Sequence, residues 1–385
     1  MAANTSIQSA PDAANVVTLA STAHDRWMHA QGIPVHHGYH VEDLRSLELG
    51  WWAERECNAA FLVLSGQEGK SEVRVTEIPP GKTLPPTKFA LDEIVYVVEG
   101  RGLTTIGAGA ASRSATFEWQ QRSMFMLPRN CATQLSNAQG NSSARLLHYN
   151  LLPICMTIMP DPSFFFGNPY TDLGVLGDGM QEVFSDAKEL PPSVEAAARG
   201  TGRVMWYGNF FPDMGVWDRL HSDAVRGAGS ERVGIQFVNS AMRSHMSVFA
   251  TGLYKKAHRH GPGVVIVIPG GEGYSVMWQE GQERVVIPWR ESSVFVPPNR
   301  WFHQHFNVGA TPARYLAFHL PRGLNMGSER VENRARDQIE YPDEDPWIRE
   351  KFESELAARG LASSMPDEAY RDRDYRWAFA DDDEE

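Results

Sequence analysis

Two His-x-His pairs occur in the stretches Lys255-Lys256-Ala257-His258-Arg259-His260-Gly261-Pro262-Gly263 and Trp301-Phe302-His303-Gln304-His305-Phe306-Asn307. Alternate side chains of a β-strand point to the same face. His258 and His260 are therefore expected to share one face, and so are His303 and His305. If the two strands oppose each other in a barrel, these imidazoles converge on a metal site. The alternative is a set of buried structural histidines.

The region around these pairs repeats an earlier part of the chain. The β-like run 264–268 is similar in sequence to the run 94–98, and a turn-rich segment follows each of them. A constant offset of 170 residues relates identical pairs along the two copies: Gly100/Gly270, Trp119/Trp289, Ser123/Ser293, Phe125/Phe295, Pro128/Pro298 and Asn137/Asn307. Such an offset indicates a duplicated domain, and short strands between Gly, Pro and Asn turns indicate a sandwich or barrel.

The two copies differ at the histidines. Where the second copy carries its three leading histidines, the first carries Lys88, Ala90 and Thr133 at the shared offset. Random placement of the 13 histidines gives about half of one His-x-His pair, so two pairs at matching sites are much harder to attribute to chance. We therefore expect a metal site in the second copy and none in the first, whereas Asn137 and Asn307 are expected to be framework.

The repeat predicts five segments. They are an N-terminal arm and extension (1–58), a metal-free N-terminal barrel (59–155), an inter-barrel linker with helices (156–235), a metal-binding C-terminal barrel (236–325), and a C-terminal helix with an acidic tail (326–385).

Short helices are expected outside the barrels. One is predicted at 22–31 and another in the linker at 185–200. Asp345 followed by Pro346 offers an N-cap and a first-turn proline for a helix that runs to about Arg359. We expect this last helix to pack across the other half of the chain or against a second subunit.

Composition excludes several classes of protein. Hydrophobic residues make up 42% and charged residues 22%, which is typical of a globular protein, and the formal net charge is −12. No basic stripe indicates a nucleic-acid partner, and no apolar run is long enough to span a membrane. The three cysteines, without ligand spacing, favour a reducing compartment. We expect a cytoplasmic protein that associates into a homo-oligomer.

These motifs resemble those of the cupins. The second cupin motif, Pro-x-Gly-x-x-His-x-x-x-Asn, is matched by Pro298, Arg300, His303 and Asn307, with arginine in place of glycine, and the stretch 252–260 fits the start of the first motif. Both copies together resemble a bicupin over about residues 60 to 325. The resemblance implies a mainly β fold of two tandem jelly-roll barrels, with short flanking helices and a C-terminal helix.

The usual acidic ligand of that family is missing. It would follow His260 after three or four intervening residues, where this chain has Val264 and Val265; Glu272 lies far along in register and stays open as an alternative ligand. The resemblance then implies a shell of His258, His260 and His303. Such a shell is similar to that of gentisate- and salicylate-type ring-cleaving dioxygenases, whose Trp-His-x-His-x-Asn run the stretch 302–307 approximates. Those enzymes place the metal in the N-terminal barrel, whereas the histidine pairs of this chain lie in the C-terminal one. The substrate of those enzymes is therefore not expected for this chain.

Three neutral imidazoles leave the full charge of a divalent ion uncompensated, which favours an anionic chelating substrate. Imidazole suits Fe, Zn, Cu and Ni; we expect Fe(II), with Mn, Ni or Zn as alternatives. The first prediction is an Fe(II)-dependent dioxygenase that uses O2 to cleave a C–C bond of a small hydroxylated aromatic or other oxygen-chelating acid. A redox-neutral lyase, decarboxylase or isomerase is the second, and a non-catalytic binding or storage bicupin is the third.

Other residues are candidates for the pocket. His305 is predicted to act as a proton relay or substrate contact, or simply to be buried, and His319 is a candidate base. Arg300 could pair with a substrate carboxylate. Arg259 is expected to point away from the metal. The remaining candidates are Tyr274, Trp278 and Trp301 as an aromatic pocket lining, and Trp206, Tyr207 and Arg243 as a lid or rim.

Overall fold

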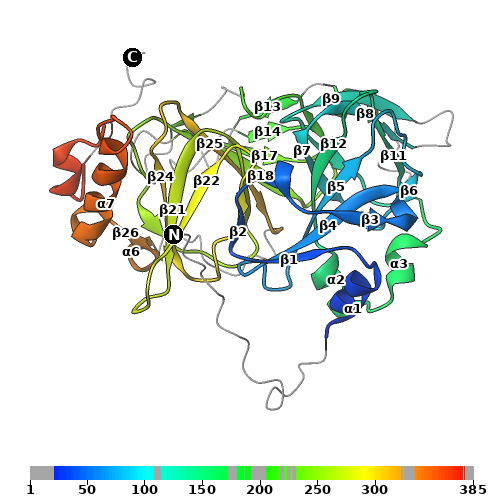
Figure 1. The fold of residues 1–385 in the computed structure, drawn as a ribbon, viewed down its shortest axis with the longest axis horizontal. Helices are drawn as coiled ribbons and strands as arrows, with labels where there is room; N and C mark the ends of the chain where they lie inside the picture. The colour runs from blue at the N-terminus through cyan, green and yellow to red at the C-terminus, as the bar shows by residue number, and fades with distance from the viewer. Residues whose placement is uncertain are drawn as a thin grey trace.

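Strands dominate the computed structural model, and helices lie mainly at its two ends (Figure 1). The structure describes residues 21–107, 114–171, 180–185, 187–191, 205–216, 221–222, 227, 231–321, 324, 334–375 and 377. The predicted mainly β fold of two tandem barrels is confirmed.

The first barrel consists of two sheets. The large one has the order β1 (Val35–Gly38), β4 (Cys57–Leu64), β5 (Glu72–Ile78), β12 (Ala144–Asn150), β7 (Glu93–Glu99), β10 (Met124–Leu127) and β15 (Phe210–Phe211), with β3 (Gly50–Trp52) on β4. The small one has the order β6 (Thr87–Lys88), β11 (Ala132–Asn137), β8 (Arg101–Ile106) and β9 (Ala115–Gln120). Because the chain alternates between the sheets, this is a jelly-roll barrel.

The second barrel repeats this plan. Its large sheet has the order β13 (Lys188–Leu190), β14 (Met205–Tyr207), β17 (Glu231–Gln236), β18 (Arg243–Phe249), β25 (Ala313–His319), β20 (Val265–Gly270), β23 (Val294–Phe295) and β2 (His40–Val41), with β16 (His221–Ser222) on β17. Its small sheet has the order β22 (Val285–Arg290), β21 (Glu272–Trp278), β24 (Phe302–Asn307), β19 (Ala257–His258) and β26 (Gln338–Ile339).

The two halves exchange one strand each. β2, from the N-terminal segment, pairs with β23 of the second barrel, where His40 lies opposite Phe295. β15, which precedes the second barrel, pairs with β10 of the first, where Phe210 lies opposite Phe125. Figure 1 shows β2 at the junction of the barrels. Neither barrel can therefore be separated at the predicted boundaries without uncovering a sheet edge.

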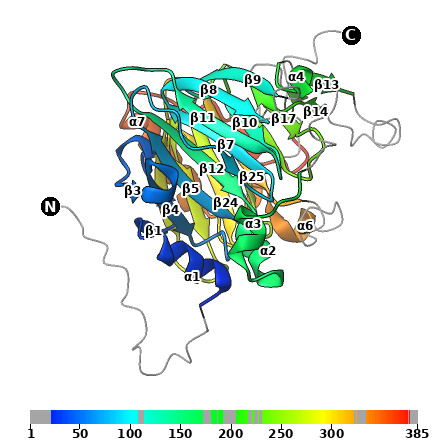
Figure 2. The ribbon, with the colours of Figure 1, turned by 90° about the vertical axis from the view of Figure 1, so that its right-hand side faces the viewer.

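The two large sheets share one hydrophobic core. Leu62 and Tyr96 of the first barrel belong to the same buried cluster as Val265 and Phe318 of the second. The rings of Tyr149 and Phe318 lie 5.3 Å apart, measured between their centroids. Figure 2 looks along the axis that joins the barrels, with the first barrel in front. The barrels are thus fixed against each other by apolar burial.

Pairing in the structure corrects the alignment of the copies. Thr87 pairs with Thr133 as His258 pairs with His303, so Thr87 replaces the predicted Lys88 as the counterpart of the first histidine. Likewise Gly100 corresponds to Gly271 and not to Gly270, because Gly100 packs on Ala144 as Gly271 packs on Ala313. The offset is 171 from Thr87/His258 to the β8–β9 connection, so Phe89 replaces the predicted Ala90 as the counterpart of His260. It is 170 from there to Asn137/Asn307, because the β8–β9 connection is one residue shorter in the second copy. It is 169 at Ala144/Ala313, because the connection after Asn307 is again one residue shorter.

The predicted framework role of the two asparagines is confirmed. Asn307 Nδ2 donates to the carbonyls of Phe249 and Thr311, and its Oδ1 accepts from the N–H of Gly309. Asn137 makes the same kind of contacts in the first barrel. Each amide closes the connection between two strands.

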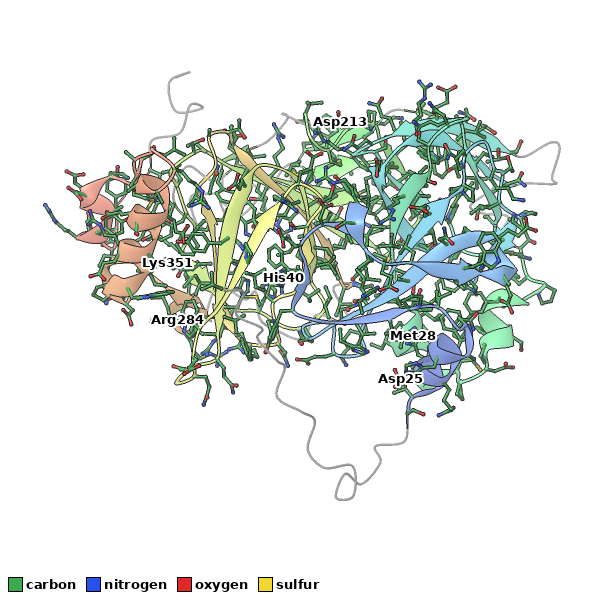
Figure 3. The ribbon with its side chains drawn as sticks, in the orientation of Figure 1. Asp25, Met28, His40, Asp213, Arg284 and Lys351 are labelled. Carbon is green, nitrogen blue, oxygen red and sulfur yellow. The ribbon has the colours of Figure 1, made fainter. Side chains whose placement is uncertain are left out.

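The helices at the ends of the molecule agree with prediction in position. α1 (Ala23–Ala30) has Thr22 as its N-cap, and α7 (Pro346–Ala357) begins after the N-cap Asp345. Met28 of α1 and Lys351 of α7 lie at opposite ends of the molecule (Figure 3). The remaining helices are α2 (Leu152–Ile158), α3 (Pro162–Phe166), α4 (Met180–Val183), α6 (Arg334–Asp337) and the 3-10 turns Leu44–Ser46, Ala53–Arg55, Tyr341–Asp343 and Asp367–Tyr370.

Two expectations about helices were wrong. α7 does not cross to the other half: Ile348, Phe352 and Leu356 pack on the outer face of the second barrel's own small sheet. In the linker, residues 188–190 form strand β13 instead of a helix because they pair with β14. The rest of that predicted helix, 192–200, lies outside the described residues. Within the described part of the chain, every helix is too short or too polar to cross a membrane.

The packing of α7 gives a test of stability. Phe352 is fully buried, with its ring 4.9 Å from Tyr254 and 5.7 Å from Phe306 between centroids. We expect Phe352→Ala to lower the free energy of unfolding by about 3–5 kcal/mol, because it leaves a cavity. Denaturant titration measures this, with the exposed Glu353→Ala as the control. Equal stability of both variants would contradict the described packing.

Candidate metal centre

Three imidazoles meet inside the second barrel. His258 lies on β19, His303 lies opposite it on β24, and His260 follows β19 by two residues. One ring nitrogen from each histidine lies within 4.8 Å of the others. The sequence folds this way because the alternation of β24 turns His303 and His305 inward and Phe302, Gln304 and Phe306 outward.

Backbone carbonyls fix the orientation of all three rings. Nδ1 of His258 lies 3.1 Å from the Lys256 carbonyl oxygen, and Nδ1 of His303 lies 3.1 Å from that of Trp301. Nδ1 of His260 lies 2.8 Å from the carbonyl oxygen of Gly261. A carbonyl only accepts, so each Nδ1 carries the proton and each Nε2 is left with its lone pair for a metal. The donor set therefore fits a divalent ion.

No carboxylate joins this cluster among the described residues. Val264, where the acidic ligand was sought, is buried and lines the cavity beside the triad. Glu272 does not reach the site: its side chain is 59% exposed and pairs with Arg359 on the surface. The cluster is thus a set of three neutral ligands.

The triad lies in a small cavity of about 30 Å³. Histidines, one arginine, one tyrosine and aliphatic residues form the lining, which contains no aspartate or glutamate: Arg232, His245, His258, His260, Val264, Ile266, His303, His305, Tyr315, Ala317 and His319. His305 and His319, both predicted for the pocket, are among them. Tyr315 and His245 were not predicted, although the alternation of 315, 317 and 319 along one strand could have placed Tyr315 beside His319.

His305 and His319 each have a hydrogen-bond partner. Nδ1 of His305 lies 2.8 Å from the Ser275 hydroxyl, which also accepts from the indole of Trp289. Nε2 of His319 lies 2.6 Å from Nδ1 of His245, so a hydrogen bond joins the two imidazoles. Both contacts can hold a proton at the cavity wall.

A buried lysine next to Tyr315 escaped the sequence analysis. Lys255 is 1% exposed, and its ammonium donates to the Ser247 hydroxyl and, at 3.2 Å, to the Tyr315 hydroxyl. Burial alone would raise the pKa of Tyr315, but the charges of Lys255 and Arg232 outweigh it, and the pKa is lowered. Lys255 could not be identified from the sequence because lysines next to a turn are usually exposed.

Arg300 and Trp301 support the site without lining it. The Arg300 N–H donates to the His260 carbonyl at 2.9 Å, in a left-handed conformation with φ of 62°. Its guanidinium binds Asp337, as does that of Arg259, which points away from the triad as predicted. Burial would raise the pKa of Asp337, but hydrogen bonds from the arginines hold it well below its ordinary value. Arg300 is thus committed to a structural ion pair.

Tyr274 and Trp278 do not line the pocket, contrary to expectation. Ser275 and Met277 pair with His305 and His303 on the inner face of β21, so the residues between and beside them face outward. Tyr274 stacks on Phe306 beneath α7, and Trp278 stacks on Phe302. Trp301 packs against Tyr39, with 5.9 Å between ring centroids. The prediction did not take into account that alternate residues of β21 face opposite sides of the sheet.

The predicted lid is also absent from the described residues. Trp206 is buried in the core between the barrels. Tyr207 pairs with Gln236 in the large sheet. The Arg243 guanidinium donates to the Leu320 carbonyl at 3.2 Å. All three lie in strands away from the site. The prediction was wrong because it rested only on their closeness in sequence to the second barrel.

Comparison with known proteins was made by sequence and by structure. No family model matches the chain, and no curated protein matches it. Similar solved structures include oxalate decarboxylase from Lactobacillus farciminis (12% identity, TM-score 0.46, 74% of this chain and 86% of that chain). Vicilin from tomato has 11% identity and a TM-score of 0.43, over 72% of this chain and 84% of that chain. The 7S globulin of Momordica charantia has 14% identity and a TM-score of 0.43, over 77% and 89%. Likeness at this level carries no information about the reaction or substrate of this chain.

The outer side of β24 gives a prediction about pH. Glu344 accepts hydrogen bonds from Gln304, between the inner histidines, and from Tyr254. Burial raises the pKa of Glu344 from 4.5 to about 8. The folded state therefore keeps a proton that the unfolded state releases, and stability falls as pH rises between these two values. We expect Glu344→Gln to remove this fall when denaturant unfolding is compared across the range; an unchanged pH dependence would contradict it.

The triad gives a prediction about metal content. We expect His258→Ala, His260→Ala and His303→Ala each to lose the bound metal, because each removes one of three ligands. Thr133→Ala, at the position of His303 in the first barrel, is the matched control and keeps it. Elemental analysis of the purified proteins measures this. Metal retained by all three histidine variants would rule out the site.

Proposed function

We propose that the second barrel is the active site of a metal-dependent enzyme, an Fe(II) dioxygenase that acts on a small oxygen-chelating organic acid. The observation that carries this proposal is the set of three imidazoles whose Nδ1 atoms all contact carbonyls, which leaves the lone pairs on Nε2, with one ring nitrogen of each histidine within 4.8 Å of the others. When bound, a divalent ion such as Fe(II) supplies Lewis acidity and, with O2, oxidation of a chelated substrate.

The charges of the cavity favour an anionic substrate. Its lining includes Arg232 and no acidic residue, and the ammonium of Lys255 lies directly behind Tyr315. Three neutral ligands add no negative charge. An enolate, phenolate or hydroxycarboxylate would therefore be attracted to this cavity.

The size of the cavity favours the smaller members of that class. A volume of about 30 Å³ holds few non-hydrogen atoms. The side chains of Val264 and Ile266 form one wall of the cavity, and the hydrogen-bonded pair His245–His319 forms another. A hydroxycarboxylate or short diketone therefore fits with less rearrangement than a substituted aromatic ring.

Tyr315 is our candidate for proton transfer. Its hydroxyl accepts a hydrogen bond from Lys255, which stabilises the phenolate and lowers the pKa of the phenol toward the working range of a general acid or base. Its ring lies 5.1 Å from that of His305 and 5.5 Å from that of His245, measured between centroids. A proton can thus be held or released at the Tyr315 hydroxyl beside the bound substrate.

The contact between Lys255 and Tyr315 also favours a second candidate function. A redox-neutral lyase, decarboxylase or isomerase requires a proton donor next to the metal more than it requires O2. The Lys255–Tyr315 contact supplies such a donor.

Oxygen uptake separates the two functions. Protein purified without added metal is analysed for its metal and then supplied with hydroxy acids, diketones and phenolic acids in an oxygen electrode. Iron together with substrate-dependent oxygen uptake supports the dioxygenase. Equal turnover under strict anaerobiosis would overturn it in favour of the redox-neutral enzyme.

Tyr315 can be tested separately from the metal. We expect Tyr315→Phe to lower kcat by about 100-fold or more, the usual contribution of a positioned acid or base, with metal content unchanged. The matched control is Tyr274→Phe, whose hydroxyl lies under α7 on the outer face of the same barrel. Steady-state kinetics over a range of pH measure both. Equal kcat in the two variants would exclude Tyr315 from the reaction.

A further inference from the structure

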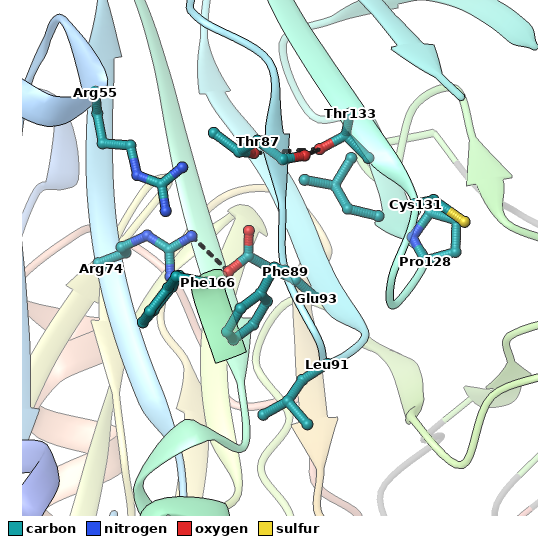
Figure 4. A pocket seen from close by; sticks show the side chains of 11 residues that line it. Arg55, Arg74, Thr87, Phe89, Leu91, Glu93, Pro128, Cys131, Thr133 and Phe166 are labelled. Carbon is teal, nitrogen blue, oxygen red and sulfur yellow. Dashed lines mark hydrogen bonds and ion pairs between the residues drawn. The ribbon is translucent and has the colours of Figure 1, made fainter. Parts of the chain in front are cut away.

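The first barrel has its own cavity at the place where the second has its triad. Thr87, Phe89 and Thr133, the counterparts of the three histidines, line a space of about 40 Å³. The two threonine hydroxyls lie 3.4 Å apart. Figure 4 shows Arg55 and Arg74 on one side of this cavity and the two threonines on another. The first barrel thus retains an interior cavity although it has no histidines at these positions.

The cavity adjoins a larger groove on the surface. The groove has a volume of about 460 Å³ and shares Arg55, Thr87 and Phe166 with the cavity. Trp27 and Trp52 line the groove as well. A ligand arriving from solvent would therefore meet Arg55 at the passage between the groove and the cavity.

The charge of Arg74 is already compensated. Its guanidinium pairs with Glu72 and Glu93, each at 2.5 Å. The second oxygen of Glu93 lies 2.9 Å from Nδ1 of His148, and the second oxygen of Glu72 lies 2.9 Å from Nε2 of His24. Asn150 donates to both carboxylates. The acidic groups next to the cavity are therefore fully engaged in this network.

The charge of Arg55 is not compensated in this way. Its guanidinium stacks on the rings of Trp52 and Phe166, at 5.4 and 5.7 Å from their centroids. Among the described residues no carboxylate lies within ion-pair distance of it, and Glu54 beside it is exposed. Burial, followed by repulsion from Arg74, lowers the pKa of Arg55, and attraction to Glu93 and Glu54 offsets these effects only in part. A partly buried cation in these surroundings would be stabilised by an anion.

We propose that the first barrel binds a small monocarboxylate, with the carboxylate on the guanidinium edge of Arg55 and the carbon part against Phe89, Leu91 and Phe166. Aromatic stacking covers the faces of the guanidinium and leaves its N–H edge for a bidentate contact. The hydroxyls of Thr87 and Thr133 add polar contacts further inside. One guanidinium with the Glu93 carboxylate in the same lining matches a monoanion better than a phosphate dianion, which Glu93 repels more strongly.

This site is independent of the metal centre. Its residues come from the N-terminal extension, the first barrel and helix α3, which follows that barrel, and none of them lines the cavity that contains the triad. It can be tested in protein from which metal has been removed, whatever reaction the second barrel performs.

Calorimetric titration of chelator-treated full-length protein with acetate and inorganic phosphate tests the proposal. We expect saturable binding of a carboxylate and weaker binding of phosphate. Arg55→Gln should weaken carboxylate binding by about tenfold or more, the usual effect of losing a charged hydrogen-bond partner. Arg101→Gln, an exposed arginine of the same barrel, and His303→Ala, in the other barrel, should bind as the wild type does.

Arg55→Lys is a control for a folding defect in Arg55→Gln. Lysine keeps the charge but cannot make the planar two-point contact, so we expect intermediate affinity. Thermal unfolding with and without acetate gives a second measurement, in which the wild type is stabilised and Arg55→Gln is not. Binding unaffected by Arg55→Gln, binding abolished by His303→Ala, preference for phosphate, or no saturable carboxylate binding to the wild type would each overturn the proposal.

Discussion

The register of β19 against β24 is the constraint on which the site depends. His258 lies directly opposite His303, and a slip of one residue would turn His303 and His305 out of the barrel and Gln304 and Phe306 into it. Contacts on both sides hold this register. β26 pairs with β19 at Gln338, and the Asn307 amide fixes the end of β24. On the outer face, Gln304 binds Glu344 beneath α7. The C-terminal segment therefore supports the site from behind although it contributes no ligand.

The two barrels show how one framework accommodates two kinds of interior chemistry. Glycines packed against tryptophans, Gly102 on Trp119 and Gly273 on Trp289, recur in both and preserve the strand geometry. The inner residues are free to diverge because they touch the cavity more than the framework. The second barrel has neutral imidazoles whose orientation is set by carbonyls. The first has an ion-pair network of Arg74 with Glu72 and Glu93.

Much of this arrangement could be predicted from the sequence. The repeat, the strand alternation and the two His-x-His pairs were enough for the barrels and for the convergence of His258, His260 and His303. Contacts between distant segments were not predictable. The exchange of β2 and β15 depends on pairing between distant segments, 255 residues apart for His40 and Phe295 and 85 residues apart for Phe125 and Phe210, and periodicity contains no such information. Tyr274 and Trp278 were misplaced because residue type was considered without strand parity. Lys255 was missed because only tertiary burial separates it from an ordinary surface lysine.

Anomalous diffraction from crystals of the protein as purified, recorded at the absorption edge of the metal found by elemental analysis, tests the central claim most directly. The account predicts one strong peak in the second barrel, bound by Nε2 of His258, His260 and His303, and no peak among Thr87, Phe89 and Thr133 of the first. Metal found elsewhere in the molecule, with the triad bound to none, would contradict it.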